Sequence, residues 1–177
     1  ASDVYKRQLL YIYTFSEYQP LILILDLFRL CLKIVLYLSA GNDNCSSLIA
    51  AARVKGFQGD DLSKHNTIAA TAKHFAGYGF AESGRDYNTV DVSKNTLYNI
   101  ILPPFMATLD AGVRTFMNGF NELDGVPVTG SLFLQRDLLK GVWNFDGFVI
   151  SDWGSIQEMI PHGYAKDGAH ATELAIK

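Results

Sequence analysis

The chain has 177 residues, of which 49% are hydrophobic, and its net charge at neutral pH is −3. This length and composition suit a globular domain with a substantial core and exclude an intrinsically disordered chain. The small negative charge gives no electrostatic case for nucleic-acid binding, and two cysteines do not decide the redox compartment.

Residues 1 to 46 differ in sequence from the rest of the chain. The run from Leu21 to Leu38 is almost entirely apolar, but Asp26, Arg29 and Lys33 interrupt it. The run is a poor membrane span, because each charge at mid-membrane costs about 2.5–3.5 kcal/mol. It is also a poor signal peptide, because charges interrupt its apolar core and no clean cleavage site follows. Because the three charges share one helical face, we predict an atypical apolar helix that is amphipathic. A marginal membrane anchor and a non-authentic segment from a misread reading frame are the alternatives.

From about residue 47 to residue 177 the sequence alternates between helical and strand patterns. A helix over 48–54, which a serine can cap, is expected to end at Gly56. A strand over 67–72 follows, and after it a long polar loop over 77–91.

The rest of this region repeats the alternation. We predict a helix from Ser93 to about 111 that is broken at Pro103-Pro104, and then a strand over 113–117. A loop over 122–130 follows, with a turn at Asp124-Gly125. The last predicted elements are a helix from Ser131 to 140, a strand over 148–150 and a helix from about Ala171. The gaps between successive strands exceed the roughly 30 residues that a right-handed β-α-β crossover needs. We therefore predict an α/β fold with a parallel sheet.

Polar or soft side chains follow each predicted strand. Because the carboxyl ends of parallel strands meet at one edge of the sheet, we expect these side chains to surround one pocket. A cation, an imidazole, an amide, a carboxylate and apolar surfaces together suit a polyhydroxylated ligand such as a sugar. The residues are Lys73 and His74, Met117 and Asn121, and Asp152 and Trp153.

Taken singly, each of these residues also has a structural explanation. Asp152 could cap a helix over 154–159, and Lys73 could be a solvated loop residue. His74 alone is more often structural than catalytic, and Met117 or Trp153 alone would be assigned to the core. The functional interpretation depends on their recurrence at the same topological position.

Five motifs, in order and with matching spacing, closely resemble glycoside hydrolase family 3, and within it the bacterial β-glucosidases of the kind found in Bacteroides. The resemblance covers residues from about 47 to 177. The motifs are KHFAGYG at 73–79, RDYN at 85–88, LPPF at 102–105, MNGFN at 117–121 with GVP at 125–127, and SDWG at 151–154.

The resemblance implies roles for individual residues. Asp152 matches the nucleophile of a retaining reaction that passes through a glycosyl-enzyme ester. Lys73 and His74 match the pair that binds the hydroxyl groups of the sugar before the cleaved bond, and Trp153 matches a wall of that subsite. Met117 matches a residue lining the pocket. Phe120 stands where many relatives have tyrosine, which removes a hydroxyl donor.

The resemblance also implies a (β/α)8 barrel, of which about three β/α units are readable here, whereas a complete barrel needs roughly 250 residues. The missing barrel units and a second domain, which normally supplies the general acid/base, are expected in the parent protein. We therefore predict a fragment of a β-glucosidase that acts on oligosaccharides or aryl β-glucosides and is inactive alone. The acid/base is left unassigned among Glu82, Asp86, Glu122 and Glu158.

No metal or organic cofactor is implied, and a membrane partner is not expected. Relatives are often periplasmic or secreted, but the localisation of this chain stays unknown. Two rival functions remain open: a non-catalytic carbohydrate-binding or scaffold fragment, and an aldolase that forms a Schiff base through Lys73.

Overall fold

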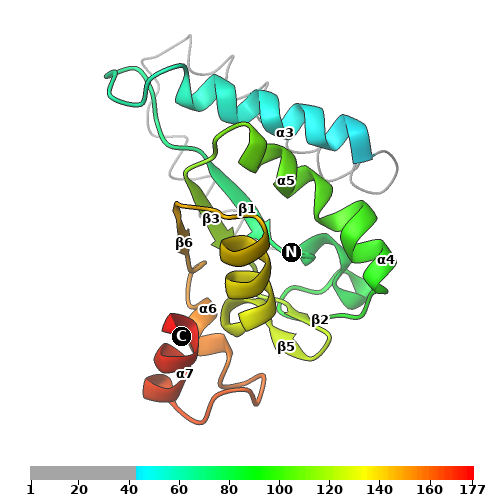
Figure 1. The fold of residues 1–177 in the computed structure, drawn as a ribbon. Coiled ribbons are helices and arrows are strands. Elements are labelled where there is room, and N and C mark those ends of the chain that lie inside the picture. Colours follow the sequence, from blue (N-terminus) through cyan, green and yellow to red (C-terminus); the bar gives the residue numbers. More distant parts are fainter. Residues whose placement is uncertain (1–42) are drawn as a thin grey trace, which may run out of the picture. The chain divides into compact units, whose positions relative to one another are not determined.

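The computed structural model describes residues 43–177, which belong to one compact unit of the chain (Figure 1). The predicted apolar helix and its membrane-anchor alternative fall on residues 1 to 46 and lie almost wholly outside the described part. Within residues 43–177, no helix has both the length and the apolar character needed to span a bilayer.

Three parallel strands form the main sheet, in the order in which they occur in the chain. They are β1 (Thr71–Phe75), β3 (Thr115–Asn118) and β6 (Phe148–Ile150). Lys73 pairs with Met117, and Met117 pairs with Ile150, so the carboxyl ends of the strands lie level with one another. Helices connect the strands, which confirms the α/β class and matches neighbouring units of a (β/α)8 barrel (Figure 1).

Two strands begin later than the sequence predicted. The residues at the start of the predicted 67–72 strand belong to a turn, because the Thr67 hydroxyl bonds the Lys64 carbonyl at 2.9 Å and the Ile68 N–H bonds the Phe57 carbonyl at 3.0 Å. Val113, the first residue of the second predicted strand, donates its N–H to Thr108 of the preceding helix at 3.0 Å. Hydrogen bonds to the preceding turn and helices therefore keep both segments out of the sheet.

The first helix, α3 (Asp43–Gln58), is longer at both ends than predicted and packs along α5 (Pro103–Asp110). Gly56 lies inside it and does not end it. Gly59 does, because its φ of 56° is left-handed and its N–H bonds the Lys55 carbonyl at 2.8 Å, as at many helix C-termini.

The helical run between β1 and β3 is divided as predicted. Ser93 accepts a hydrogen bond from the Thr96 N–H at 3.1 Å and caps α4 (Lys94–Thr96). The π-helical η3 (Leu97–Ile101) follows, and α5 begins at Pro103, which lacks the N–H that a helix interior requires.

The helices on either side of β6 are η5 (Phe133–Val142) before it and α6 (Ser155–Glu158) and α7 (Gly168–Ile176) after it. Ser131 accepts from the Leu134 N–H at 3.3 Å, which confirms it as the cap before η5. The predicted start of α7 near Ala171 is wrong, because Asp167 caps the helix earlier through the His170 N–H at 2.8 Å.

A second, smaller sheet lies beyond the carboxyl ends of β1 and β3 (Figure 1). It consists of β2 (Thr89–Val90), β4 (Glu122–Leu123) and β5 (Val126–Pro127). The predicted turn at Asp124-Gly125 is confirmed, with φ values of 52° and 78°. The segments predicted as plain loops instead hold these strands and three short helical turns, which are η1 (Tyr78–Phe80), η2 (Glu82–Gly84) and η4 (Val128–Gly130).

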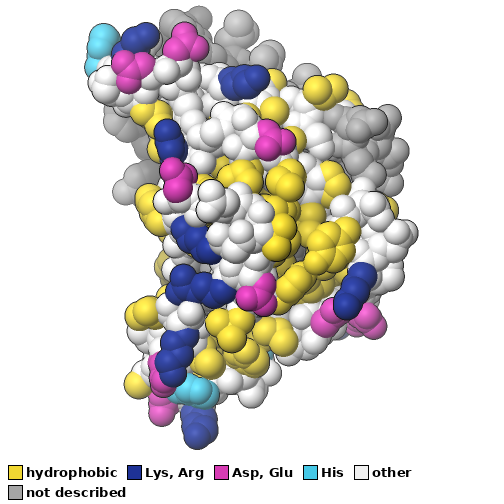
Figure 2. All heavy atoms as spheres, viewed as in Figure 1, with side chains coloured by type: hydrophobic (Ala, Val, Ile, Leu, Met, Phe, Trp, Pro, Cys, Tyr) yellow, Lys and Arg dark blue, Asp and Glu magenta, His cyan; other side chains and the backbone are white. Residues whose placement is uncertain are grey.

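Aromatic rings form the centre of the core. Phe75 of β1 lies 5.3 Å from Phe116 of β3, and Phe116 lies 4.9 Å from Phe145. Trp143 is partly buried and packs against this core, with its ring centroid 5.9 Å from that of Phe75. Figure 2 shows that other hydrophobic side chains reach the surface around η5 and α5, and the exposed ones on these helices include Met106, Phe133 and Val142.

Candidate functional site

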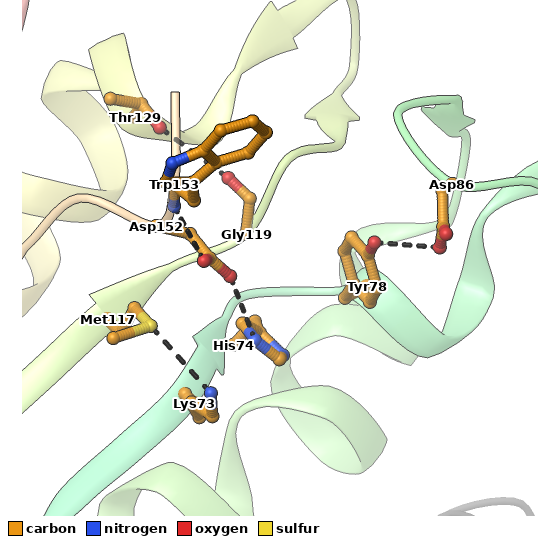
Figure 3. Close-up of polar contacts among 9 residues, drawn as sticks. All are labelled: Lys73, His74, Tyr78, Asp86, Met117, Gly119, Thr129, Asp152 and Trp153. Carbon is orange, nitrogen blue, oxygen red and sulfur yellow. Dashed lines mark hydrogen bonds and ion pairs between the residues drawn. The ribbon is translucent and has the colours of Figure 1, made fainter. Parts of the chain in front are cut away.

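The carboxyl ends of the three parallel strands bring the predicted site residues together (Figure 3). Lys73 and Met117 occupy paired positions on β1 and β3, and the lysine ammonium lies 3.9 Å from the methionine sulfur. His74 follows Lys73, and its Nε2 lies 3.0 Å from Oδ2 of Asp152, two residues beyond β6. Residues far apart in sequence thus form a single polar cluster.

Asp152 directs its carboxylate into this cluster and does not cap a helix. Gly154 occupies the cap position of α6, and the helix receives no side-chain cap. Oδ1 of Asp152 accepts from the Trp153 N–H at 2.7 Å, and Oδ2 faces His74. With 17% of its side chain exposed, the carboxylate is fixed from two sides and still open to a ligand.

His74 is held in its neutral form. Burial lowers the pKa of His74 below its usual value, and the positive charge of Lys73 lowers it further, whereas Asp152 acts in the opposite direction. A neutral imidazole can still donate from Nε2 to the carboxylate. The negative charge of Asp152 is therefore oriented by His74 without being neutralised by it.

This lowered pKa predicts a pH-dependent contribution to stability. The unfolded chain binds a proton at His74 near pH 6.5, whereas the folded chain binds it only at lower pH, so stability falls as pH drops below about 6.5. We expect the unfolding free energy of the wild type to fall relative to His74→Gln between neutral pH and about pH 5. Urea unfolding of both chains across this range measures the difference; parallel pH profiles would contradict it.

Trp153 and Phe120 occupy the rim of the site. Trp153 adjoins Asp152 in Figure 3, but 84% of it is exposed, so the alternative assignment to the core is wrong. Phe120 lies 6.1 Å from the ring of Tyr78 and 4.6 Å from that of Tyr87. Asn121 is fully buried and donates to the Ala76 carbonyl at 3.2 Å, so its predicted place in the pocket is wrong and it holds the loop after β1.

Comparison with known proteins now assigns the family. The profile of the "Glycosyl hydrolase family 3 N terminal domain" matches residues 40–175. The chain belongs to glycoside hydrolase family 3. This confirms the predicted resemblance and places its start a few residues before position 47.

The relatives of this family 3 chain include β-glucosidases. It is 40% identical over 132 residues to the periplasmic β-glucosidase of Salmonella typhimurium, a match that covers 75% of this chain and 17% of the relative. A Bacteroides ovatus β-glucosidase is 39% identical over 94 residues, which cover 52% of this chain and 12% of the relative. A β-xylosidase of Formosa agariphila is 33% identical over 135 residues, which cover 74% of this chain and 19% of the relative.

Solved structures support the same relationship. The β-glucosidase from Listeria innocua in complex with glucose superimposes with a TM-score of 0.71 and 43% identity, covering 73% of this chain and 18% of that one. The chain thus spans less than a fifth of the length of these relatives. The family 3 domain to which it belongs is of the TIM-barrel type, in agreement with the parallel β/α units seen here.

One contact beside the polar cluster, between Tyr78 and Asp86, was not predicted. The Tyr78 hydroxyl donates to Oδ1 of Asp86 at 2.7 Å, and the Tyr78 ring lies 5.2 Å from that of His74 (Figure 3). Both residues stand in motifs of the 77–91 segment, but their contact depends on how that segment folds back. Within residues 43–177, no group of three metal-ligating side chains could hold a metal ion.

Proposed function

We propose that this chain is the nucleophile-bearing part of a retaining β-glucosidase. The observation that carries the proposal is the 3.0 Å contact of His74 with Asp152, beside Lys73 at the end of the adjacent strand. Membership of family 3 and the relatives described as β-glucosidases support the same assignment.

Asp152 has the environment that a nucleophile needs. One of its carboxylate oxygens attacks the anomeric carbon of glucose while the bond to the leaving oxygen breaks, and a second carboxyl gives that oxygen a proton. Water then attacks the anomeric carbon of the resulting ester and gives a proton to that second carboxyl, so glucose is released and Asp152 becomes a carboxylate again. The Trp153 N–H and His74 fix the attacking group in place before the substrate arrives.

Lys73 and His74 hold the sugar in this proposal. The ammonium group can donate charge-assisted hydrogen bonds to neighbouring hydroxyl groups, and neutral His74, whose Nε2–H faces Asp152, can accept one at Nδ1. Met117 beside Lys73 and Trp153 beside Asp152 offer apolar surfaces to the C–H groups of the ring. We propose that Phe120 is a third apolar contact for the sugar ring, one that lacks the hydroxyl group a tyrosine would have there.

Glucose binding by the 177-residue chain tests this assignment. Lys73→Met retains the length of the side chain but removes its charge, so we expect glucose affinity to fall about tenfold to hundredfold. Lys94→Met is the matched control, because Lys94 is an exposed lysine on α4. Isothermal titration calorimetry compares the three chains, with xylose as a second ligand. Equal glucose affinity in the wild type and Lys73→Met would contradict the role of Lys73, and tighter binding of xylose would favour a β-xylosidase.

A further inference from the structure

A row of aromatic rings leads from the Asp152 carboxylate toward the surface. His74, which contacts Asp152, lies 5.2 Å from Tyr78, and Tyr78 lies 6.1 Å from Phe120. The ring of Tyr87 ends the row, 4.6 Å from Phe120, and this tyrosine is 37% exposed. Tyr87 thus contacts Phe120 on the side of the site and is partly exposed to solvent.

The backbone holds Tyr87 in an unusual conformation. Its φ of 63° is in the left-handed region, which is rare for a bulky residue and energetically unfavourable. The residues on both sides are fixed: Asp86 accepts from the Tyr78 hydroxyl at 2.7 Å, and Oδ1 of Asn88 accepts from the Thr89 N–H at 2.8 Å. Such a conformation persists only where its surroundings impose it, and here it directs the ring onto Phe120.

The hydroxyl of Tyr87 lies in the field of the site's carboxylates. Partial burial raises the pKa of Tyr87 above its usual value, and the charges of Glu158, Asp86 and Asp152 raise it further. The phenol therefore stays protonated and can donate a hydrogen bond at neutral pH.

We propose that Tyr87, backed by Phe120, is the surface against which the leaving group of a β-glucoside lies, and that it sets a preference for ring-shaped leaving groups. The inference rests on the proposed function, since it needs glucose held over Asp152 by Lys73 and His74. The exposed part of the Tyr87 ring offers an aromatic surface to an aryl ring or a second sugar. Phe120 lacks a hydroxyl, and the Tyr87 phenol supplies a donor beside it.

The test compares the affinities of phenyl β-glucoside and methyl β-glucoside for the 177-residue chain by calorimetry. We expect the wild type to bind the phenyl compound about five- to tenfold more tightly. Tyr87→Asn removes the ring but tolerates the left-handed backbone, so it should lose this preference and keep its affinity for the methyl compound. Tyr87→Phe should retain the preference, and Tyr98→Asn, which removes an exposed tyrosine on η3, is the matched control.

The outcomes separate this inference from the proposed function. A phenyl preference that persists in Tyr87→Asn, or that is absent from the wild type, would overturn the role of Tyr87 and leave glucoside binding intact. Failure of the wild type to bind either glucoside would overturn both proposals. A measurement on the unmodified chain does not depend on whether the variants fold. With phenyl β-glucoside bound, NMR should show contacts between the phenyl protons of the ligand and the Tyr87 ring. Their absence would equally overturn the inference.

Discussion

The Phe75→Ala chain is expected to lose about 3–5 kcal/mol of unfolding free energy, a large share of the total stability of a domain of this size. Phe75, at the end of β1, is completely buried in the core, and its ring lies 5.2 Å from Phe105 and 5.3 Å from Phe116. Alanine would leave a cavity that three different elements would have to close. Because Phe75 directly follows His74, disorder there would also reach the proposed sugar-binding pair.

Chemical denaturation with urea measures this loss. Phe148→Ala is the matched control, because Phe148 is also a strand phenylalanine but is 61% exposed, and we expect it to change stability by less than about 0.5 kcal/mol. A Phe75→Ala chain that unfolds within about 1 kcal/mol of the wild type would show that the aromatic cluster does not form the centre of the core.

The second large effect concerns turnover by the chain alone. Retaining hydrolysis needs a second carboxyl group about 5–5.5 Å from the nucleophile. Of the four carboxylates considered for this role, Asp86 accepts from Tyr78, and Glu122 accepts from Thr89 and faces His162 at 3.9 Å. Within residues 43–177, Asp152 contacts His74 and Trp153, and no contact identifies a second carboxyl as its catalytic partner.

We therefore expect hydrolysis of phenyl β-glucoside by the 177-residue chain to be slower than that by a full-length family 3 β-glucosidase by a factor of about 10²–10⁴ or more. Initial rates of phenol release measure this difference. Robust hydrolysis that disappears in Asp152→Asn would show that the chain carries its own proton donor and would contradict this expectation.

The parts of the site that could be predicted from sequence are those fixed by local patterns. The Phe-Val-Ile run identified β6 at its observed bounds, and a parallel sheet then required the residues after each strand to meet at one edge. Motif resemblance added the roles proposed for Lys73, His74 and Asp152. The contact between His74 and Asp152 follows from these two kinds of information together.

The features that could not be predicted depend on long-range contacts. The two-residue strands β2 and β4 are too short to show an alternating pattern, and they exist because distant segments pair. The late start of β1 follows from hydrogen bonds of Thr67 and Ile68 to the preceding segment. The 84% exposure of Trp153 likewise depends on which segments pack over it, and no property of neighbouring residues determines that.

The most direct test of the central claim, that Asp152 is a nucleophile, is covalent capture with a dinitrophenyl fluoro-β-glucoside. Its leaving group departs without a proton donor, and the fluorine slows hydrolysis of the ester, so the experiment needs only the nucleophile and the sugar site. Peptide mass spectrometry should locate one fluoroglucosyl ester on Asp152 of the wild-type chain and none in Asp152→Asn. Saturable sugar binding without any adduct, or an adduct on another residue such as Lys73, would contradict it.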